Sequence, residues 1–447
     1  MRHRAFAVLA FAAALATFTS CRKGTTIIYD PEDGYYKDGM FYTLAGQWQY
    51  IWRVMDNSYV FWDIDRTDWD ALYDKYLQEF KTLDRQLDSL DAAYSSGTLS
   101  VLDYAEMMST KMKTVTDSML SRDLESLTDQ HFKAAFYNRH ECTRYAVQPS
   151  LSRLKRRSDY HPSLTNRQAC SEDGSYTGTD YVFDAIKSVY GVTPRYALDE
   201  SEGRWAYSCS PADGIFYLRL SGYYISNKDD AEFADTLLSD FFNNVAAAAA
   251  DGTLKGIILD NRGNPGGYGN DFSIFPGKFI HESVVIEKQK TKNGLGRFDY
   301  SPWSNLEVKP SDETTDIGNA PFVILQDMHS ASMGELTGYA CTLGIPSAVI
   351  IGERSTGATG MLIPDYPDLF HAGAANYNNK GDEPYVYTST FSSKLYIRSD
   401  KEWRSIEGIG IEPDIYCPLD YAELAAGGRD TQLDRAVKYI LDSCGNQ

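Results

Sequence analysis

The spacing of apolar residues changes character near the middle of the chain. In the first half, large apolar side chains recur every three or four positions, which is the spacing of one buried helix face. Two such sets are Trp48, Ile51, Trp52 and Met55, and Trp69, Leu72, Tyr76 and Phe80. The pattern extends from Phe41 to about Tyr137 and predicts a helical N-terminal domain over residues 41–150.

The second half contains short, continuous apolar runs. Four of them have the composition of buried strands: residues 214–220, 255–260, 321–326 and 347–352. Helical stretches follow the first and the third of these runs, at residues 231–250 and 331–343. Strands that alternate with helices predict a mostly parallel sheet with covered faces. The expected fold class is therefore α/β, with its core over residues 213–445.

A polar segment separates these two regions. Its basic cluster, from Arg153 to Arg157, is followed by serine, asparagine and glycine, which is typical of a loop with a solvated surface. Residues 151–212 are therefore predicted to form a linker or a small insert, without a clear PDZ domain.

The N-terminus has the pattern of an export signal. Arg2 and Arg4 precede a mostly apolar run that is too short to span a bilayer as a helix. We expect residues 1–20 to be a signal peptide, Cys21 to be the lipidated first residue of a lipoprotein, and residues 21–40 to form its tether. The alternative is a plain signal peptide with an incidental cysteine. Either way the protein is exported, and we expect a cell-envelope location, facing the periplasm or on the outer membrane.

Composition excludes several classes of function. The chain has 447 residues, 43% of them hydrophobic, and 43 basic against 62 acidic residues give a net charge of −19. This charge argues against a nucleic-acid partner, whose phosphates require lysine and arginine, and against direct binding to an anionic membrane. We therefore expect membrane contact only through the lipid anchor. The cysteines after Cys21 are scattered, without a CxxC pair or histidines at ligand spacing, so we predict no metal site.

One segment offers a nucleophile. In His329-Ser-Ala-Ser-Met-Gly-Glu335, Ser332 stands at a predicted turn from strand to helix, where the positive helix end favours a developing oxyanion. The alternative is structural, because Ser332 and Glu335 also have the spacing of a capping box.

Three further segments supply partners for such a nucleophile. Gly266 and Gly267 follow a buried strand and could present amides to an oxyanion, although a tight turn explains them equally well. His131 could act as the base that activates a serine, although a lone histidine is more often structural. Glu407 lies between Ile406 and Gly408 and could orient an imidazole, although a surface acid is the commoner explanation.

Together, and in this order, these segments resemble a family of serine peptidases. The matching stretches are Gly214–Leu220, Arg262–Gly267, Ser330–Glu335, Gly352–Gly357 and Gly408–Asp414. They are similar to the C-terminal processing (tail-specific) peptidases, and within them to the tricorn-core and interphotoreceptor retinoid-binding-protein-like branch found in many Bacteroidetes lipoproteins. The resemblance implies a crotonase/ClpP-like spiral core behind the helical N-terminal domain.

The resemblance also implies a role for each residue. Ser332 is the nucleophile, His131 is the base in a Leu-x-Asp-x-His segment, and Glu407 orients the base. Backbone amides near Gly266, Gly267 and Met333 would hold the oxyanion. No cofactor is implied, the substrate is an unfolded protein or an oligopeptide, and the oligomeric state is not predicted.

Two departures from the family pattern keep alternatives open. The lysine of the Ser-Lys branch is replaced by Ala358, and Gln130 precedes the histidine where the family has serine or glycine. The main hypothesis is a lipid-anchored serine endopeptidase. The first alternative is a catalytically inactive family member that acts as a peptide- or ligand-binding lipoprotein. The second is an unrelated α/β envelope protein in which Ser332 is only a helix cap.

Overall fold

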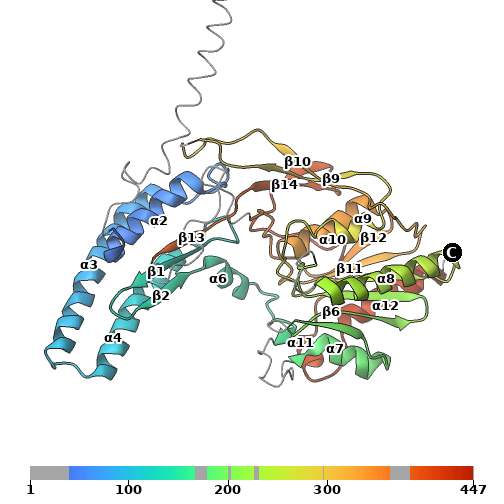
Figure 1. The fold of residues 1–447 in the computed structure, drawn as a ribbon, viewed down its shortest axis with the longest axis horizontal. Helices are drawn as coiled ribbons and strands as arrows, with labels where there is room; N and C mark the ends of the chain where they lie inside the picture. The colour runs from blue at the N-terminus through green and yellow to red at the C-terminus, as the bar shows by residue number, and fades with distance from the viewer. Residues whose placement is uncertain are drawn as a thin grey trace, which may run out of the picture. The chain divides into compact units, whose positions relative to one another are not determined.

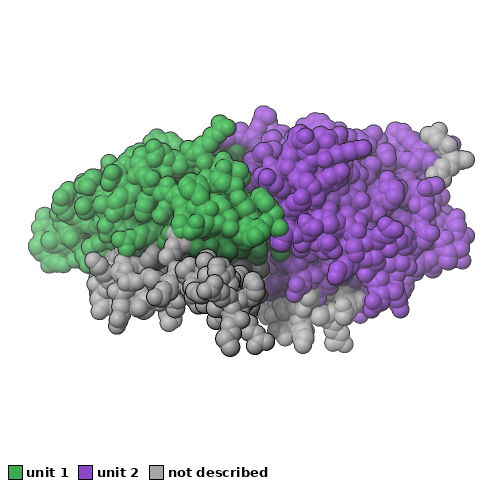
Figure 2. All heavy atoms as spheres, turned by 90° about the horizontal axis from the view of Figure 1, so that it is seen from above, with its two compact units in different colours: residues 1–153, 290–303, 360–392 green, residues 154–289, 304–359, 393–447 purple. Residues whose placement is uncertain are grey.

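The computed structural model describes residues 40–166, 179–199, 203–225, 231–294, 296–362 and 383–445. The chain forms two compact units, which Figure 2 shows in different colours. The first unit comprises residues 1–153, 290–303 and 360–392, and the second comprises residues 154–289, 304–359 and 393–447. The predicted signal peptide, Cys21 and all but the last residue of the tether lie outside the described residues.

The first unit begins with a helical region, as the sequence predicts. Its main helices are α2 (Leu44–Ser58), α3 (Trp69–Ser95) and α4 (Val101–Lys113), and α2 and α3 lie side by side (Figure 1). Capping side chains start them, because Thr43 accepts a hydrogen bond from the Gly46 amide and Asp68 from the Ala71 amide. The predicted apolar face is buried, with Trp48 at its centre against the ring of Trp69.

The prediction that the helical pattern extends to about Tyr137 is wrong. Residues 133–138 form strand β1 (Lys133–Asn138), which pairs in antiparallel fashion with β2 (Thr143–Val147) and β13 (Tyr385–Tyr387). Because β13 comes from a distant part of the chain, the pairing that makes β1 a strand is tertiary and has no local sequence signal.

The second unit is built on a seven-stranded sheet in the order β16-β12-β11-β8-β7-β6-β5. Figure 1 labels β6, β11 and β12 of this sheet. Its strands are β5 (Arg195–Asp199), β6 (Gly203–Ala212), β7 (Ile215–Leu220), β8 (Gly256–Asp260), β11 (Phe322–Gln326), β12 (Ala348–Gly352) and β16 (Ile415–Tyr416). All pairs from β7 to β16 are parallel, whereas β5, β6 and β7 are antiparallel. The four apolar runs of the sequence are thus β7, β8, β11 and β12.

Helices cover both faces of this sheet. Val323 and Leu325 of β11 share a buried cluster with Leu433 and Ile440 of α12 (Thr431–Gly445). On the other face Ile324 contacts α10 (Met333–Gly344) at Gly338, and α8 (Ala231–Ala250) covers β5, β6 and β7. Burial on both faces explains why the strands read as continuous apolar runs. The predicted α/β class with an N-terminal helical region is confirmed.

A second, smaller sheet has the order β10-β9-β14-β15. Its strands are β10 (Ser304–Val308), β9 (Val284–Lys290), β14 (Ser392–Ile397) and β15 (Glu402–Arg404). Of the helices that the structure describes, none is both long enough and apolar enough to cross a membrane.

Candidate active site

Ser332 occupies a strained turn in the second unit. It follows the carboxyl end of the buried strand β11 and immediately precedes α10, with φ 52° and ψ −125°. A non-glycine residue in this conformation is costly, and such residues persist where the surroundings enforce them, often at functional sites. Residues at the carboxyl ends of parallel strands are where α/β sheets carry their chemistry.

The buried carboxylate of Glu335 holds this turn in place. It accepts hydrogen bonds from the amides of Ser332 (3.0 Å), Gly357 (2.7 Å) and Ala358 (2.8 Å), and from the Ser355 hydroxyl. Burial raises the pKa of Glu335 to about 7, although these four hydrogen bonds oppose the rise. The predicted capping box is present, and its glutamate also anchors the loop that carries Ala358.

The glycine turn lies directly against Ser332. A Cβ at Gly266 would be 2.7 Å from Ser332 Cβ, 3.1 Å from Ser332 Oγ and 3.0 Å from the Met333 nitrogen. At Gly267, a Cβ would be only 2.0 Å from the carbonyl oxygen of Tyr223. Both positions also have positive φ, 110° and 152°, so only glycine fits at Gly266 and Gly267.

The amides at this turn differ in availability. The Gly266 amide donates to Asn264 Oδ1 at 2.8 Å, so it is not a free donor, which corrects the sequence expectation for this residue. Gly267 pairs with Tyr223 in an isolated parallel β-bridge. The two hydrogen bonds of this bridge join the Tyr223 amide to the Gly266 carbonyl oxygen and the Tyr268 amide to the Tyr223 carbonyl oxygen, so the bridge does not use the Gly267 amide. The Met333 amide is the first of α10, where a helix provides no backbone acceptor.

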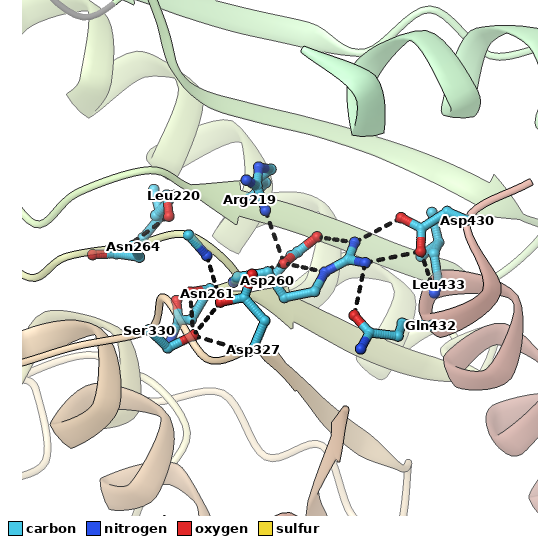
Figure 3. A network of polar contacts seen from close by, with 12 residues as sticks. Arg219, Leu220, Asp260, Asn261, Asn264, Asp327, Ser330, Asp430, Gln432 and Leu433 are labelled. Atoms are coloured by element: carbon cyan, nitrogen blue, oxygen red, sulfur yellow. Dashed lines mark hydrogen bonds and ion pairs between the residues drawn. The ribbon is translucent and has the colours of Figure 1, made fainter. Parts of the chain in front are cut away.

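A buried charge network fixes the strand that leads into this turn (Figure 3). Arg262 is 0% exposed and binds Asp260 (2.6 Å) on one side and Asp430 (2.8 Å, through two nitrogens) on the other. Arg219 also binds Asp260, at 3.0 Å. Burial would raise the pKa of Asp260, but the Arg262 and Arg219 guanidinium groups lower it to about 2. The carboxyl end of β8 is therefore held by paired charges in the interior.

Hydrogen bonds join the loop after β8 to the loop after β11. Asp327 Oδ1 accepts from the Gly263 amide at 2.8 Å, and the Ser330 hydroxyl donates to the Asn261 carbonyl oxygen at 2.8 Å (Figure 3). Ser330 is completely buried, whereas Ser332 is half-buried. Of the two serines in the Ser-Ala-Ser run, Ser330 therefore has a structural role, because its hydroxyl holds the two loops together.

Glu407 belongs to the same unit and is buried, at 3% exposure. The alternative that it is a surface acid is therefore wrong. Its Oε2 accepts from the Thr359 amide (2.7 Å) and from the Thr359 hydroxyl (3.2 Å). Since Ala358 donates to Glu335 and Thr359 to Glu407, two successive residues connect the turn of Ser332 to Glu407.

His131 lies in the first unit, just before β1. Its amide donates to Asp129 Oδ1 (2.8 Å), and its Nδ1 is 3.4 Å from the Ser389 hydroxyl. That hydroxyl donates to Asp129 (2.8 Å). Burial lowers the pKa of His131, and the Asp129 charge opposes this change. A lowered pKa leaves the imidazole neutral near pH 7, as a base requires.

Sequence reasoning missed Asp129 and Ser389 as neighbours of His131. Asp129 could have been found from its position two residues before His131. In an Asx-turn, an aspartate accepts a hydrogen bond from the amide two residues later in the chain. Ser389 had no such signal, since 258 residues separate it from His131.

Comparisons with known proteins assign the core. Residues 215–417 match the family model of peptidase family S41. This region is therefore similar to peptidase family S41. A comparison with curated proteins finds no match.

Solved structures agree with the S41 fold. The chain is similar to a candidate peptidase from Parabacteroides merdae ATCC 43184, with TM-score 0.58 and 18% identity over 89% of this chain and 97% of that one. It is also similar to mature CPAF complexed with lactacystin, with TM-score 0.55 and 11% identity over 91% of this chain and all of that one. At these identities the likeness concerns the fold. The match to peptidase family S41 supports a serine-peptidase-like function and suggests a polypeptide as the class of substrate.

Proposed function

We propose that the protein is an exported, lipid-anchored serine endopeptidase that hydrolyses unfolded proteins or oligopeptides. The observation that carries the proposal is the strained turn of Ser332 at the start of α10, packed against the glycine turn of the S41 region. A structural helix cap needs no such conformation, because capping residues normally have extended backbone.

In the proposed reaction Ser332 Oγ attacks the scissile carbonyl carbon while His131 accepts its proton. The oxyanion receives hydrogen bonds from the Gly267 and Met333 amides, and Glu407 orients the imidazole. His131 then protonates the leaving amine, and a water molecule hydrolyses the acyl-enzyme by the same steps in reverse. The role of His131 rests on the resemblance of its segment and on its lowered pKa.

The test is labelling by a fluorophosphonate together with cleavage of unfolded casein. We expect Ser332→Ala to abolish both the labelling and the cleavage. Ser330→Ala should still be labelled, because it retains Ser332. His131→Ala should slow cleavage roughly 10²–10⁴-fold, since a general base contributes that much. Labelling that is equal in Ser332→Ala and wild type would remove Ser332 from the mechanism.

The inactive alternative has its own observation. Ala358 is buried, and its amide is used by Glu335, so the position of the family lysine carries only a small packed side chain. If the protein binds peptides but wild type and Ser332→Ala are equally unable to cleave them, the inactive alternative is correct.

The anchor is tested separately. We expect metabolically supplied palmitate to label the full-length protein in a bacterial host, and Cys21→Ser to lose both the label and the membrane association. Palmitate incorporation that survives in Cys21→Ser would contradict the assignment.

A further inference from the structure

His161 is a buried histidine that the proposed mechanism does not use. It lies in the second unit between α6 (Pro149–Lys155) and β3 (Thr165–Asn166), in a stretch predicted above to be a linker or a small insert. Its Nε2 is 3.0 Å from Glu353 Oε2, and its Nδ1 is 2.7 Å from the Pro162 carbonyl oxygen. The histidine is 6% exposed and the glutamate 1%, so two titratable groups meet in the interior.

Both ring nitrogens of His161 face an acceptor. A carbonyl oxygen and a carboxylate oxygen can only accept, so each contact needs a hydrogen on the ring. A neutral imidazole has one N–H group, whereas an imidazolium has two. Because imidazole is a stronger base than a carboxylate, the proton of the Nε2 contact stays on the ring. The arrangement therefore requires an imidazolium at His161 and a carboxylate at Glu353.

The groups that face the ring favour this charge. Burial would lower the pKa of His161, but the Glu353 hydrogen bond and the Asp327 charge act in the opposite sense, and the pKa is raised above its ordinary value of 6.5. Tyr421, the first residue of α11 (Tyr421–Ala425), stacks on the ring with 5.8 Å between centroids, and the His329 ring lies edge-on at 5.3 Å. An aromatic face packed against a cation is favourable.

Residues 157–162, called the strap below, are bonded to two loops of the candidate site. The His161 carbonyl oxygen accepts from His329 Nε2 at 2.8 Å, and His329 belongs to the loop after β11 that carries the nucleophile. Arg157 Nη1 donates to the Ser355 carbonyl oxygen at 3.0 Å, in the loop after β12. The strap therefore contacts both loops through its backbone and side chains.

These two loops hold the nucleophile turn together. The Ser355 hydroxyl donates to Glu335, whose carboxylate also accepts from the Ser332 amide. The Thr356 amide donates to the Ser330 carbonyl oxygen at 3.0 Å and so joins the loop after β12 to the loop after β11. All of these residues belong to the second unit. The position of the strap therefore bears on the nucleophile turn through hydrogen bonds within one unit.

We propose that His161, as an imidazolium bound to Glu353, is a positioning residue that holds the turn of Ser332 for the peptidase reaction. The inference rests on the proposed function, in which Ser332 is the nucleophile. When the imidazolium loses a proton, one of its two contacts has no hydrogen, and two acceptors face each other at hydrogen-bond distance. The ring then turns and the strap loosens its hold on both loops. Activity therefore falls as the pH rises through the pKa of His161.

The charge on the ring can be measured without any activity. Nuclear magnetic resonance of histidine labelled with ¹³C at Cε1 follows each ring through its titration, and the signal missing from His161→Gln belongs to His161. We expect its midpoint above pH 6.5 in wild type and at lower pH in Glu353→Gln, where an amide replaces the charge. In that variant the neutral ring can accept from the amide NH₂ group while Nδ1–H binds Pro162, so both contacts stay satisfied.

The pH profile of kcat/KM for peptide cleavage tests the positioning role. Wild type should lose activity on the alkaline side with the midpoint of the His161 signal. Glu353→Gln should lack that decline and be at most roughly threefold slower near pH 6, since a neutral hydrogen bond replaces a charge-assisted one. His161→Leu should be roughly tenfold slower near pH 6, the effect of about one hydrogen bond. Glu307→Gln, the same change at an exposed position of β10, should match wild type, including the decline.

Three outcomes would overturn the proposal. The first is a His161 signal in wild type with its midpoint at or below pH 6.5. The second is a Glu353→Gln profile that keeps the decline at the same midpoint, because the decline would then belong to another group such as Glu335, whose pKa is about 7. The third is a His161→Leu enzyme as active as wild type. If His161→Leu does not fold, the profile of Glu353→Gln still decides.

The two measurements separate this inference from the proposed function. A protein that neither cleaves peptides nor reacts with the fluorophosphonate would reject the proposed function and the positioning role with it. The difference in midpoint between wild type and Glu353→Gln would still establish the buried ion pair. An active enzyme whose alkaline decline persists in Glu353→Gln would reject the positioning role alone.

Discussion

Replacing Gly266 by alanine tests the packing of the glycine turn against the nucleophile. The new Cβ would meet Ser332 Cβ at 2.7 Å and the Met333 nitrogen at 3.0 Å, in a backbone with φ 110°. Left-handed strain on alanine costs about 1–2 kcal/mol, and an extra methyl group in a packed site typically costs about 1–3 kcal/mol. We therefore expect the free energy of unfolding to fall by about 2–5 kcal/mol.

A matched variant separates the cost of steric contact with Ser332 from the cost of backbone strain. Gly252 also has positive φ, 71°, but a Cβ there would have no neighbour within 4 Å. Gly252→Ala should therefore lose only about 1–2 kcal/mol. The difference between the two variants, measured by urea unfolding with unchanged m-values, gives the cost of the close approach to Ser332.

The same substitution has a functional consequence. Because the Cβ crowds both Ser332 Oγ and the Met333 amide, Gly266→Ala should lower kcat about as much as the loss of one oxyanion donor, roughly 10²–10³-fold. Gly252→Ala, between α8 and β8, should cleave at the wild-type rate. Equal losses of unfolding free energy in the two variants, or a wild-type rate in Gly266→Ala, would refute the reasoning.

Two further predictions concern buried charges. Arg262→Met removes the buried ion pair with Asp430 and one of the two buried ion pairs of Asp260, and should lower the free energy of unfolding by about 3–5 kcal/mol in urea titrations. Arg195→Met breaks an ion pair whose arginine is 62% exposed and should cost less than about 1 kcal/mol; similar losses would show that the Arg262 network is not stabilising. Burial raises the pKa of Glu335 from 4.5 to about 7, so the native state retains a proton that the unfolded chain releases. This contribution is complete below pH 4.5 and is lost as the pH rises through 7, a change of roughly 3 kcal/mol. The stability difference between wild type and Glu335→Gln should show this slope, and a difference that is constant between pH 4.5 and 7 would contradict it.

The strands and helices that carry Ser332 could be predicted from the sequence because their signals are local. The predicted strand at residues 321–326 and helix at 331–343 match β11 and α10 to within two residues. A strand buried on both faces is apolar throughout, and the helix that follows begins at a polar capping residue. The end of the strand and the start of the helix can therefore both be predicted from residues next to each other in the sequence.

Other features depend on residues that are far apart in the chain. The strand β1 was predicted as helix because its partner β13 lies about 250 residues later, and Arg262 finds Asp430 across 168 residues. Thr359 and Glu407 hydrogen-bond although 48 residues separate them, and no sequence pattern links them.

The sequence by itself determined the central strands β7, β8, β11 and β12, the α/β class and the candidate nucleophile, since propensity and hydrophobic period act over a few residues. The tertiary structure alone decided that Glu407 is buried and that the Gly266 amide is occupied. These properties depend on which groups exclude water from one another, and that is settled only when distant segments pack together.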